Sequence, residues 1–323
     1  MTLTAAPYYA DVADGPEDAR VFWVHAADGV RIRLGHWPAK GISQGTVLLM
    51  PGRTEYIEKY GRTARDLTER GLDVLCIDWR GQGLADRSLE DPRRGHVIHF
   101  DEYQADLDAM MQAATDLNLP KPLHMLAHSM GGCIGLRGLM RDLPFTGVAF
   151  SGPMWGIRMR VYTRPAAWAL SWSSGKVGLG HAYAPGTGAG SYVATEPFEG
   201  NLLTGDIEMF EYMRRQIVTH PDLQLGGPSL NWLHAALFET RALARMASPR
   251  YPCLTYVGSD ERIVDVPRIH QRMARWPGGT LRVIDGGRHE MLMDNPEMRT
   301  AIADEMAAHY LSASDSKDAL LSA

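Results

Sequence analysis

The residue whose surroundings most favour chemistry is Ser129, which lies between an apolar segment and a helix-like one. Leu123–Ala127 is predicted to be a buried strand, and the residues two before and two after the serine, Ala127 and Gly131, are small. A nucleophile on a sharp strand-to-helix turn has strained backbone angles and tolerates only small neighbours there. The pattern is that of a nucleophile elbow, G-x-S-x-G, with alanine in place of the first glycine. It predicts a serine that attacks a carbonyl carbon.

An acid is expected further along the chain. A serine hydroxyl is a poor nucleophile at neutral pH, so a base must remove its proton and a carboxylate must orient that base. Where the serine lies on such an elbow, the acid and then the histidine follow it in the sequence. Tyr251–Val257 is predicted to be a late strand, and three carboxylates follow it: Asp260, Glu261 and Asp265. Chain order predicts that one of them acts with the serine, but it does not choose between them.

The histidine predicted to act as the base is His289. Leu281–Ile284 is predicted to be the last strand, and two glycines before the histidine let the loop bend back toward the serine. His128 lies directly beside Ser129, but a sharp turn directs adjacent side chains apart. We therefore do not expect His128 to be the base.

A second backbone amide is needed to stabilise the oxyanion. Thr46–Met50 is predicted to be a buried strand that ends at Pro51 and Gly52. Proline has no N–H to donate, and glycine lets the backbone approach closely. The remaining candidate donors are the amides of Arg53 and of Met130, which begins the helix after the serine. These two residues are the predicted oxyanion hole.

Metal and disulfide chemistry have little support in the sequence. His96 and His99 have the i, i+3 spacing of metal ligands, but no cysteine or acidic partner is patterned around them. The three cysteines, Cys76, Cys133 and Cys253, all fall in apolar segments and are predicted to be reduced core residues. We expect no metal centre and no cofactor.

Several segments together resemble the α/β-hydrolase fold, in particular the branch of monoacylglycerol lipases and bacterial lysophospholipases. The matching segments are Leu48–Arg53, Asp78–Gly83, Ala127–Gly132, Gly258–Asp265 and Gly287–Glu290. The Pro-Gly-Arg and Arg-Gly-Gln-Gly sequences are more similar to the lysophospholipase side, because monoacylglycerol lipases more often have His-Gly in place of Pro51-Gly52. The resemblance implies an α/β-hydrolase fold with an inserted cap.

The resemblance also selects among the three acids. The family places its acid three residues after the glycine that ends the late strand. Counted from Gly258, this position is Glu261. Asp260 remains the alternative, because aspartate is commoner in that role, and Asp265 resembles a position that is structural in the family.

The rest of the chain alternates between predicted strands and helices. A hairpin is predicted over Val21–Trp37, with Asp-Gly at its turn. The predicted strands after it are Thr46–Met50, Val74–Ile77, Leu123–Ala127, Gly147–Phe150, Tyr251–Val257 and Leu281–Ile284, and the predicted helices are Tyr60–Arg70, Glu102–Leu117 and Met130–Arg141. Such alternation predicts a mostly parallel sheet with helices on both faces. Ligands then bind beyond the carboxyl ends of the strands, where the candidate residues fall.

The alternation stops over residues 151–229, which we expect to be a cap or lid above the site. The core is then discontinuous, over residues 1–150 and 230–312, and residues 313–323 are expected to form a flexible tail. A short helix is predicted over Ala166–Trp172. The cap contains Trp155, Trp168 and Trp172, which can line an acyl pocket or fill the cap's own core. It also contains Arg158, Arg160 and Arg164, which, like the Arg53 side chain, can meet a lipid phosphate or be solvated.

Composition agrees with a globular enzyme. The chain has 323 residues, 45% of them hydrophobic and 22% charged, with a formal net charge of −5. The mild charge and the lack of basic runs disfavour nucleic acid as a partner. Residues 1–20 show no basic-then-apolar leader, and no apolar run approaches the ~18 residues of a membrane span. We expect a cytoplasmic protein without an obligate protein partner, which contacts the inner membrane peripherally, through its cap.

The function predicted from these residues is hydrolysis of carboxylic esters of single-chain lipids through an acyl-enzyme. Ser129 would be the nucleophile, His289 the base and Glu261 the acid. Three alternatives stay open: cleavage of a peptide N-terminus by the same triad, cleavage of a C–C bond, and a ligand-binding protein that has lost catalysis.

Overall fold

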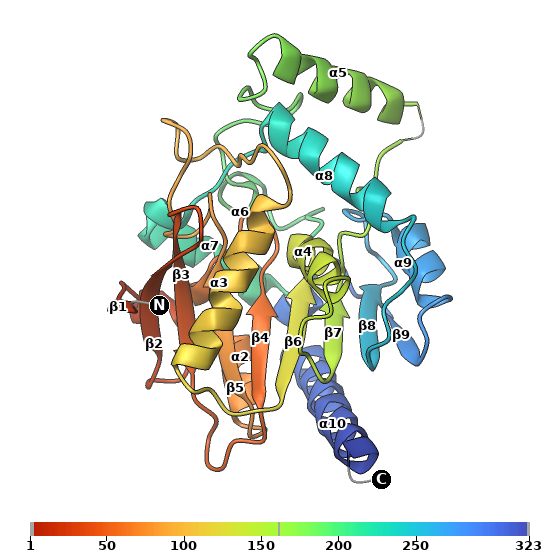
Figure 1. The fold of residues 1–323 in the computed structure, drawn as a ribbon. Coiled ribbons are helices and arrows are strands. Elements are labelled where there is room, and N and C mark those ends of the chain that lie inside the picture. Colours follow the sequence, from red (N-terminus) through yellow and green to blue (C-terminus); the bar gives the residue numbers. More distant parts are fainter. Residues whose placement is uncertain (1–2, 161, 322–323) are drawn as a thin grey trace.

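The fold is built around one large sheet (Figure 1). The computed structural model describes residues 3–160 and 162–321, and over these residues nine strands pair in the order β1-β2-β3-β5-β4-β6-β7-β8-β9. The strands are β1 Thr4–Ala5, β2 Arg20–His25, β3 Arg31–Trp37, β4 Thr46–Met50, β5 Asp73–Asp78, β6 Leu123–His128, β7 Val148–Ser151, β8 Cys253–Gly258 and β9 Gly279–Ile284. Pairing is antiparallel from β1 to β5 along this order and parallel from β5 to β9. The predicted N-terminal hairpin and the mostly parallel sheet are confirmed.

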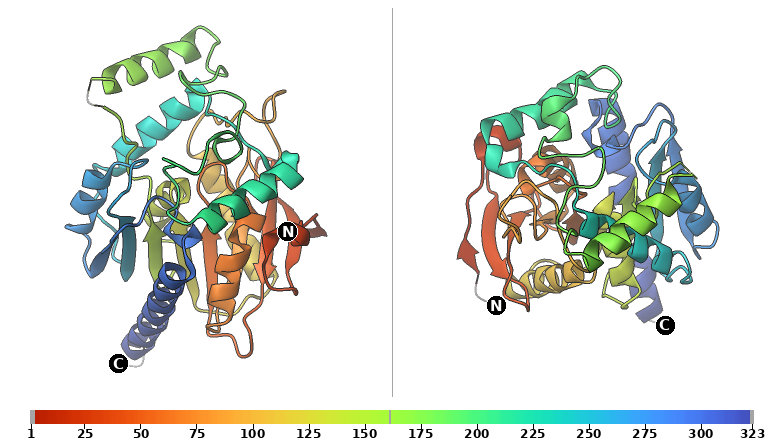
Figure 2. Two further views of the ribbon diagram at one scale, coloured as in Figure 1. Left: turned by 180° about the vertical axis from the view of Figure 1, so that it is seen from behind. Right: turned by 90° about the horizontal axis from the view of Figure 1, so that it is seen from above.

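Helices cover both faces of the sheet, as predicted. They are α1 Ala10–Ala13, η1 Ile57–Tyr60, α2 Gly61–Thr68, α3 Glu102–Asp116, α4 Met130–Leu139, α5 Arg164–Lys176, α6 Tyr192–Thr195, α7 Ile207–Thr219, η2 Pro221–Leu223, α8 Leu230–Leu243, α9 Val266–Met273, η3 Met291–Met293 and α10 Pro296–Leu321. Figure 1 shows α3 and α4 in front of the sheet, and the view from behind in Figure 2 shows α2 and α10 on the opposite face.

Strand β4 illustrates why the central strands lack an alternation of apolar and polar residues. Val47 and Leu49 pack on the face covered by α2 and α10, and Leu48 and Met50 pack on the face covered by α3 and α4. Successive side chains of a strand point to opposite faces of the sheet. Because both faces are covered, all four side chains are fully buried, and no polar alternation is left in the sequence.

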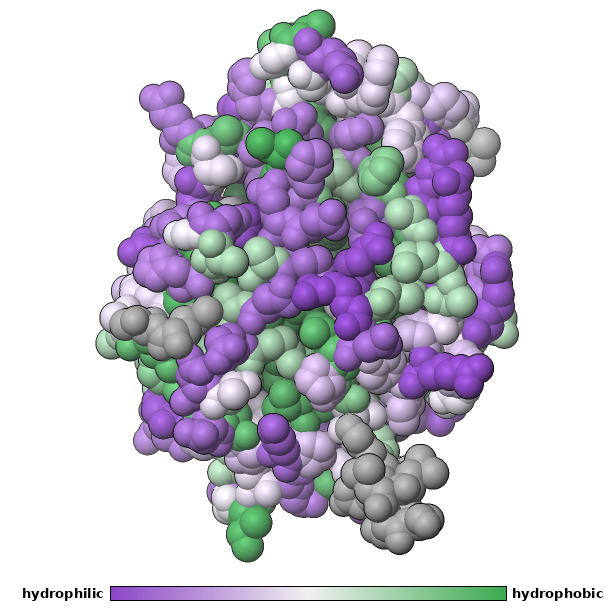
Figure 3. All heavy atoms as spheres, in the orientation of Figure 1, coloured by the Kyte–Doolittle hydropathy of each residue, from purple (hydrophilic) through white to green (hydrophobic). Residues whose placement is uncertain are grey.

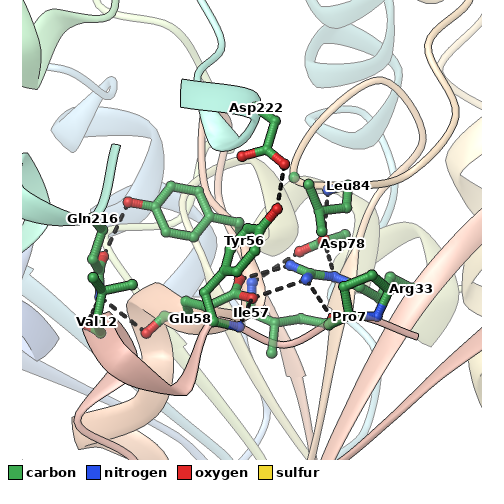
Figure 4. A network of polar contacts seen from close by, with 12 residues as sticks. Pro7, Val12, Arg33, Tyr56, Ile57, Glu58, Asp78, Leu84, Gln216 and Asp222 are labelled. Atoms are coloured by element: carbon green, nitrogen blue, oxygen red, sulfur yellow. Dashed lines mark hydrogen bonds and ion pairs between the residues drawn. The ribbon is translucent and has the colours of Figure 1, made fainter. Parts of the chain in front are cut away.

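A buried ion network anchors β3 to the elements beside the site (Figure 4). The Arg33 guanidinium donates to Asp78 Oδ2 at 2.7 Å and to the two oxygens of Glu58 at 2.8 and 2.6 Å. Asp78 in turn accepts the N–H groups of Ile57 and Leu84, each at 2.8 Å. Buried charges are tolerated when they are paired and hydrogen-bonded in this way. The network therefore fixes η1 and the Arg-Gly-Gln-Gly loop relative to the sheet.

Several element boundaries differ from the prediction by one or more residues, and two of the differences involve proline. Strand β8 begins two residues later than expected, because Pro252 has no N–H to donate to the ladder. The helix predicted over Ala166–Trp172 is present and longer. It begins at Arg164, with Pro165 in its first turn, where helical N–H groups have no partner in any case.

The segment predicted to be a cap, residues 151–229, contains α5, α6 and α7. Helix α5 packs against α8, and both lie beyond the carboxyl ends of the strands (Figures 1 and 2). The predicted tail starts inside α10, which runs to Leu321. The division into core, cap and tail stays a prediction. Among the helices of the described residues, none combines the length and apolar character needed to cross a bilayer.

Candidate active site

Ser129 lies at the turn between β6 and α4, with φ +48° and ψ −115°. Side-chain-bearing residues rarely adopt a positive φ, and such strain is concentrated at functional sites. The turn requires a glycine two residues later: a Cβ on Gly131 would lie 2.0 Å from the Met50 carbonyl oxygen. The Ser129 N–H donates to the Ser151 carbonyl oxygen at 3.1 Å. The elbow is therefore fixed by both neighbouring strands, β4 and β7.

His289 joins the serine to a carboxylate. Its Nε2 lies 2.9 Å from Ser129 Oγ, and its Nδ1 lies 2.7 Å from Glu261 Oε2. The three side chains come from the ends of β6, β8 and β9 and are each at most 9% exposed. A ring that donates Nδ1–H to a carboxylate presents its Nε2 lone pair to the hydroxyl, which is the tautomer that a general base needs. The arrangement can deprotonate the serine as it attacks.

Among the three acids considered from the sequence, Glu261 is the one that contacts the histidine. Its second oxygen, Oε1, accepts the N–H groups of Ile263 and Val264 at 2.6 and 3.1 Å. Burial would raise the pKa of Glu261, but the His289 ring and these amides outweigh burial and hold the pKa below its usual value. Asp260 is exposed and lies 3.6 Å from the Arg262 guanidinium. The third acid, Asp265, bonds to Arg164 in α5 at 3.0 Å.

The turn after β4 lies against the serine. A Cβ on Gly52 would be 3.0 Å from Ser129 Cβ, so this glycine permits the close approach. The Gly52 N–H donates to the Glu55 carboxylate and is therefore engaged. The amides of Arg53 and of Met130, at the N-terminus of α4, remain the predicted oxyanion hole.

Sequence reasoning missed a cluster of buried ionisable groups beside the histidine. Glu55, Lys59, His128 and Glu290 are each at most 5% exposed. Lys59 Nζ donates to Glu55 Oε1 at 2.5 Å and to Glu290 Oε1 at 2.7 Å. His128 Nε2 lies 3.4 Å from Glu290 Oε2, and its ring centroid lies 4.8 Å from that of His289. In the sequence, Glu290 adjoins the predicted base and Glu55 lies four residues before Lys59, but neither spacing indicates burial.

The charges in this cluster stabilise one another. Burial would lower the pKa of His128, but Glu290 and Glu55 outweigh burial and raise it. Burial would raise the pKa of Glu290, but Lys59 and His128 hold it well below its usual value. Within the described residues, Glu55, His128 and Glu290 also form a group whose ligand atoms, all within 4.8 Å of one another, could surround a cation. The Lys59 ammonium already supplies a cation to both carboxylates.

We expect Glu290→Gln to lower the free energy of unfolding by about 3 kcal/mol at neutral pH, because it leaves Lys59 and His128 with one carboxylate fewer. The folded-state pKa of Glu290 lies below its unfolded value of about 4.3. Its contribution is therefore complete above that pH and is lost as the pH falls through the folded-state pKa. The difference between the two proteins should shrink in acid, which urea unfolding at about pH 7 and about pH 3 checks.

Glu211→Gln is the matched control for this experiment. Glu211 is exposed and pairs with Arg214 on the surface of α7, so its loss should change stability by less than about 1 kcal/mol at either pH. A Glu290→Gln difference that stays constant with pH would contradict the assigned charge state.

A cavity of about 440 Å³ opens at Ser129 and His289. Its walls are mainly apolar and come from the core and from the predicted cap. The apolar residues lining it are Tyr56, Met154, Ile157, Tyr192, Val193, Leu202, Leu203, Met213, Ile217, Pro228, Trp232, Ile263 and Val264. Pockets of this size and character bind small, largely apolar ligands.

Arg53 is the cationic residue at this cavity without an acidic partner in the part of the chain that the structure describes. Its Nη2 donates to the Gly226 carbonyl oxygen at 2.6 Å, and its guanidinium lies over the Trp232 ring. Burial lowers the pKa of Arg53 to about 10, which still leaves it charged at neutral pH. By contrast, Arg158 and Arg160 of the predicted cap bond to the Glu261 carbonyl oxygen and to a tyrosine hydroxyl.

Comparison with known proteins decides the family. Residues 41–296 match the family described as serine aminopeptidase, S33. The chain belongs to this family. Among relatives of this S33 protein, lysophospholipase L2 of Escherichia coli (strain K12) is 34% identical over 277 residues, which cover 81% of this chain and 80% of that protein. The monoacylglycerol lipase of Mycolicibacterium smegmatis is 25% identical over 281 residues, covering 85% and 91% of the two chains.

Solved structures agree on the fold of the S33 protein. A soluble variant of monoglyceride lipase from Saccharomyces cerevisiae superposes with a TM-score of 0.73 at 18% identity, covering 95% of this chain and 99% of that one. A likeness at this identity concerns the fold alone. Together with the relatives above, it confirms the predicted α/β-hydrolase fold and its lysophospholipase and monoacylglycerol lipase branch.

Proposed function

We propose that the protein hydrolyses carboxylic esters of single-chain lipids through an acyl-enzyme. The observation that carries the proposal is the hydrogen-bonded series Ser129–His289–Glu261 at the end of a mainly apolar cavity. The lysophospholipase and monoacylglycerol lipase names of the relatives support the same class of substrate.

The proposed reaction has two halves. Ser129 Oγ attacks the acyl carbonyl carbon while His289 Nε2 takes the hydroxyl proton, and Glu261 stabilises the imidazolium. The oxyanion is held by the amides of Arg53 and Met130. His289 then protonates the leaving alcohol, which gives an acyl-serine. Water attacks this ester while His289 takes its proton. His289 then returns the proton to Ser129 Oγ, so that the fatty acid is released and the serine is regenerated.

Within this class, the Arg53 guanidinium, which has no acidic partner among the described residues, favours a lysophospholipid over a monoacylglycerol. A lysophospholipid carries a phosphodiester beside its ester, and guanidinium groups bind phosphate oxygens with charge-assisted hydrogen bonds. A monoacylglycerol offers no anion to compensate this charge. We assign the Arg53 side chain as the contact for the head group.

Access to such lipids involves a membrane surface, and we propose that the α5 and α8 region contacts it peripherally. Leu170 and Trp172 on α5 and Phe238 on α8 are 43%, 58% and 63% exposed. Figure 3 shows hydrophobic and polar residues interspersed over this end of the molecule. Exposed aromatic side chains of this kind suit the interface between water and lipid.

The proposal is tested with purified protein on three substrates: an oleoyl lysophospholipid, the matching oleoyl glycerol and an aminoacyl anilide. We expect the two lipids to be cleaved, the lysophospholipid with the higher kcat/KM. Arg53→Met should lower the ratio of the two lipid kcat/KM values by about tenfold, because one charged hydrogen bond is lost. Cleavage of the anilide alone would favour the aminopeptidase alternative, and an unchanged lipid ratio would remove the head-group role of Arg53.

A further inference from the structure

Two buried side chains hold the glycine that precedes the proposed oxyanion-hole amide. The Gly52 N–H donates to the Glu55 carboxylate, and the Gly52 carbonyl oxygen accepts from Gln82 Nε2 at 2.7 Å. Gln82 Nε2 also lies 3.1 Å from the Glu55 carbonyl oxygen. Glu55 and Gln82 are 3% and 2% exposed. We name Glu55 and Gln82 the Gly52 clamp.

The clamp determines where the Arg53 amide points. The Gly52 C=O and the Arg53 N–H belong to one planar trans peptide, in which the two groups point in opposite directions. By holding the carbonyl oxygen, Gln82 directs the Arg53 N–H to the opposite side. Glu55 meanwhile keeps the N–H of Gly52 itself bonded within the turn. A peptide plane fixed in this way needs no reorganisation when the oxyanion forms.

The clamp is itself anchored to the histidine loop. The Glu55 carboxylate accepts from Tyr60 Oη at 2.6 Å and from Lys59 Nζ at 2.5 Å. Lys59 continues to Glu290, the residue after the base. These contacts link the turn that carries the Gly52–Arg53 peptide to the loop that carries His289, which are the two parts of the site that must act on one carbonyl group.

We infer that Glu55 and Gln82 are positioning residues for ester hydrolysis, which act through the Gly52–Arg53 peptide by aligning its N–H with the developing oxyanion. The inference rests on the proposed function and deepens it. Neither side chain is required to touch the reacting atoms.

Gln82→Met tests the inference, because it keeps the side-chain length and removes the donor to the Gly52 carbonyl oxygen. Loss of one oxyanion donor lowers kcat by about 10²–10³-fold, and misalignment of one should lower it by about 10–100-fold with KM nearly unchanged. A thionoester of the same acyl group separates alignment from general damage, because sulfur is a weak hydrogen-bond acceptor. The oxoester-to-thionoester ratio of kcat/KM should fall by nearly the same factor as kcat.

Gln104→Met is the matched control. Gln104 is also buried and donates through Nε2 to a backbone carbonyl oxygen, that of Ile134 at 3.0 Å, but it lies in α3. Its variant should leave the oxoester-to-thionoester ratio at the wild-type value. Glu55→Gln, which removes the charge with little change in shape, provides a second test if Gln82→Met does not fold, and it should also lower the ratio.

The outcomes separate this inference from the proposed function. If the wild-type enzyme cleaves lipid esters and reacts with a fluorophosphonate, the proposed function stands. A wild-type ratio in folded Gln82→Met or Glu55→Gln then overturns the clamp alone. If the wild-type enzyme neither cleaves esters nor reacts with the label, the proposed function fails, and the clamp fails with it.

Discussion

Ser129→Ala should lower kcat/KM for a lipid ester by about 10⁶-fold, because the group that forms the acyl-enzyme is lost while the fold stays intact. The remaining rate would come from binding and from the oxyanion donors alone. The measurement is steady-state hydrolysis, combined with fluorophosphonate labelling followed by intact mass. Wild type should gain one label and the variant none.

Ser151→Ala is the control for this experiment. Its hydroxyl is buried in the neighbouring strand β7 and has no hydrogen-bond partner within the residues that the structure describes. This variant should label and turn over like wild type. Equal labelling of Ser129→Ala and wild type would remove Ser129 as the nucleophile.

Glu261→Gln should lower kcat by about 10³–10⁴-fold, because an amide cannot stabilise the imidazolium and can hold the ring in the wrong tautomer. KM should change little, since the carboxylate lies behind the histidine and away from the substrate. Asp260→Asn is the matched control at the adjacent position, where the side chain is exposed and pairs only loosely with Arg262. It should retain activity within about threefold, as expected for a surface substitution.

Side-by-side measurement of kcat and KM for the two variants decides the acid. If Asp260→Asn alone loses turnover, the loop rearranges in the working enzyme and Glu261 is not the acid. If both variants lose turnover equally, the loss reflects the conformation of the whole loop and does not identify Glu261 as the acid.

The order of the fold was predictable because its signals are local. The apolar strands, the small residues around Ser129 and the glycines before His289 each reflect a constraint within a few residues. The signal that identifies the acid, by contrast, was not confined to a few neighbouring residues. Chain order left three carboxylates, and the resemblance favoured Glu261. In the structure, the amides of Ile263 and Val264 hold one oxygen of Glu261, so that the other meets the ring.

The buried charges could not be predicted in this way. Pattern reasoning places Glu and Lys at the surface, because they are rarely buried without partners. The partner of Lys59 is Glu290, 231 residues further along the chain, and only the folded sheet brings the two together. The same holds for Gln82, whose contact with Gly52 depends on how two loops meet. Helices α8 and α9 were also not predicted from the sequence.

The Arg33 network bears on how much of the chain is needed for a folded, active protein. The family match begins at residue 41, after β3 has ended. A fragment cut at that boundary would lose the guanidinium that neutralises Glu58 and Asp78, and would leave two anions buried side by side. We therefore do not expect the stretch that matches the family model to fold alone, because the first forty residues supply an internal counter-ion for the catalytic scaffold.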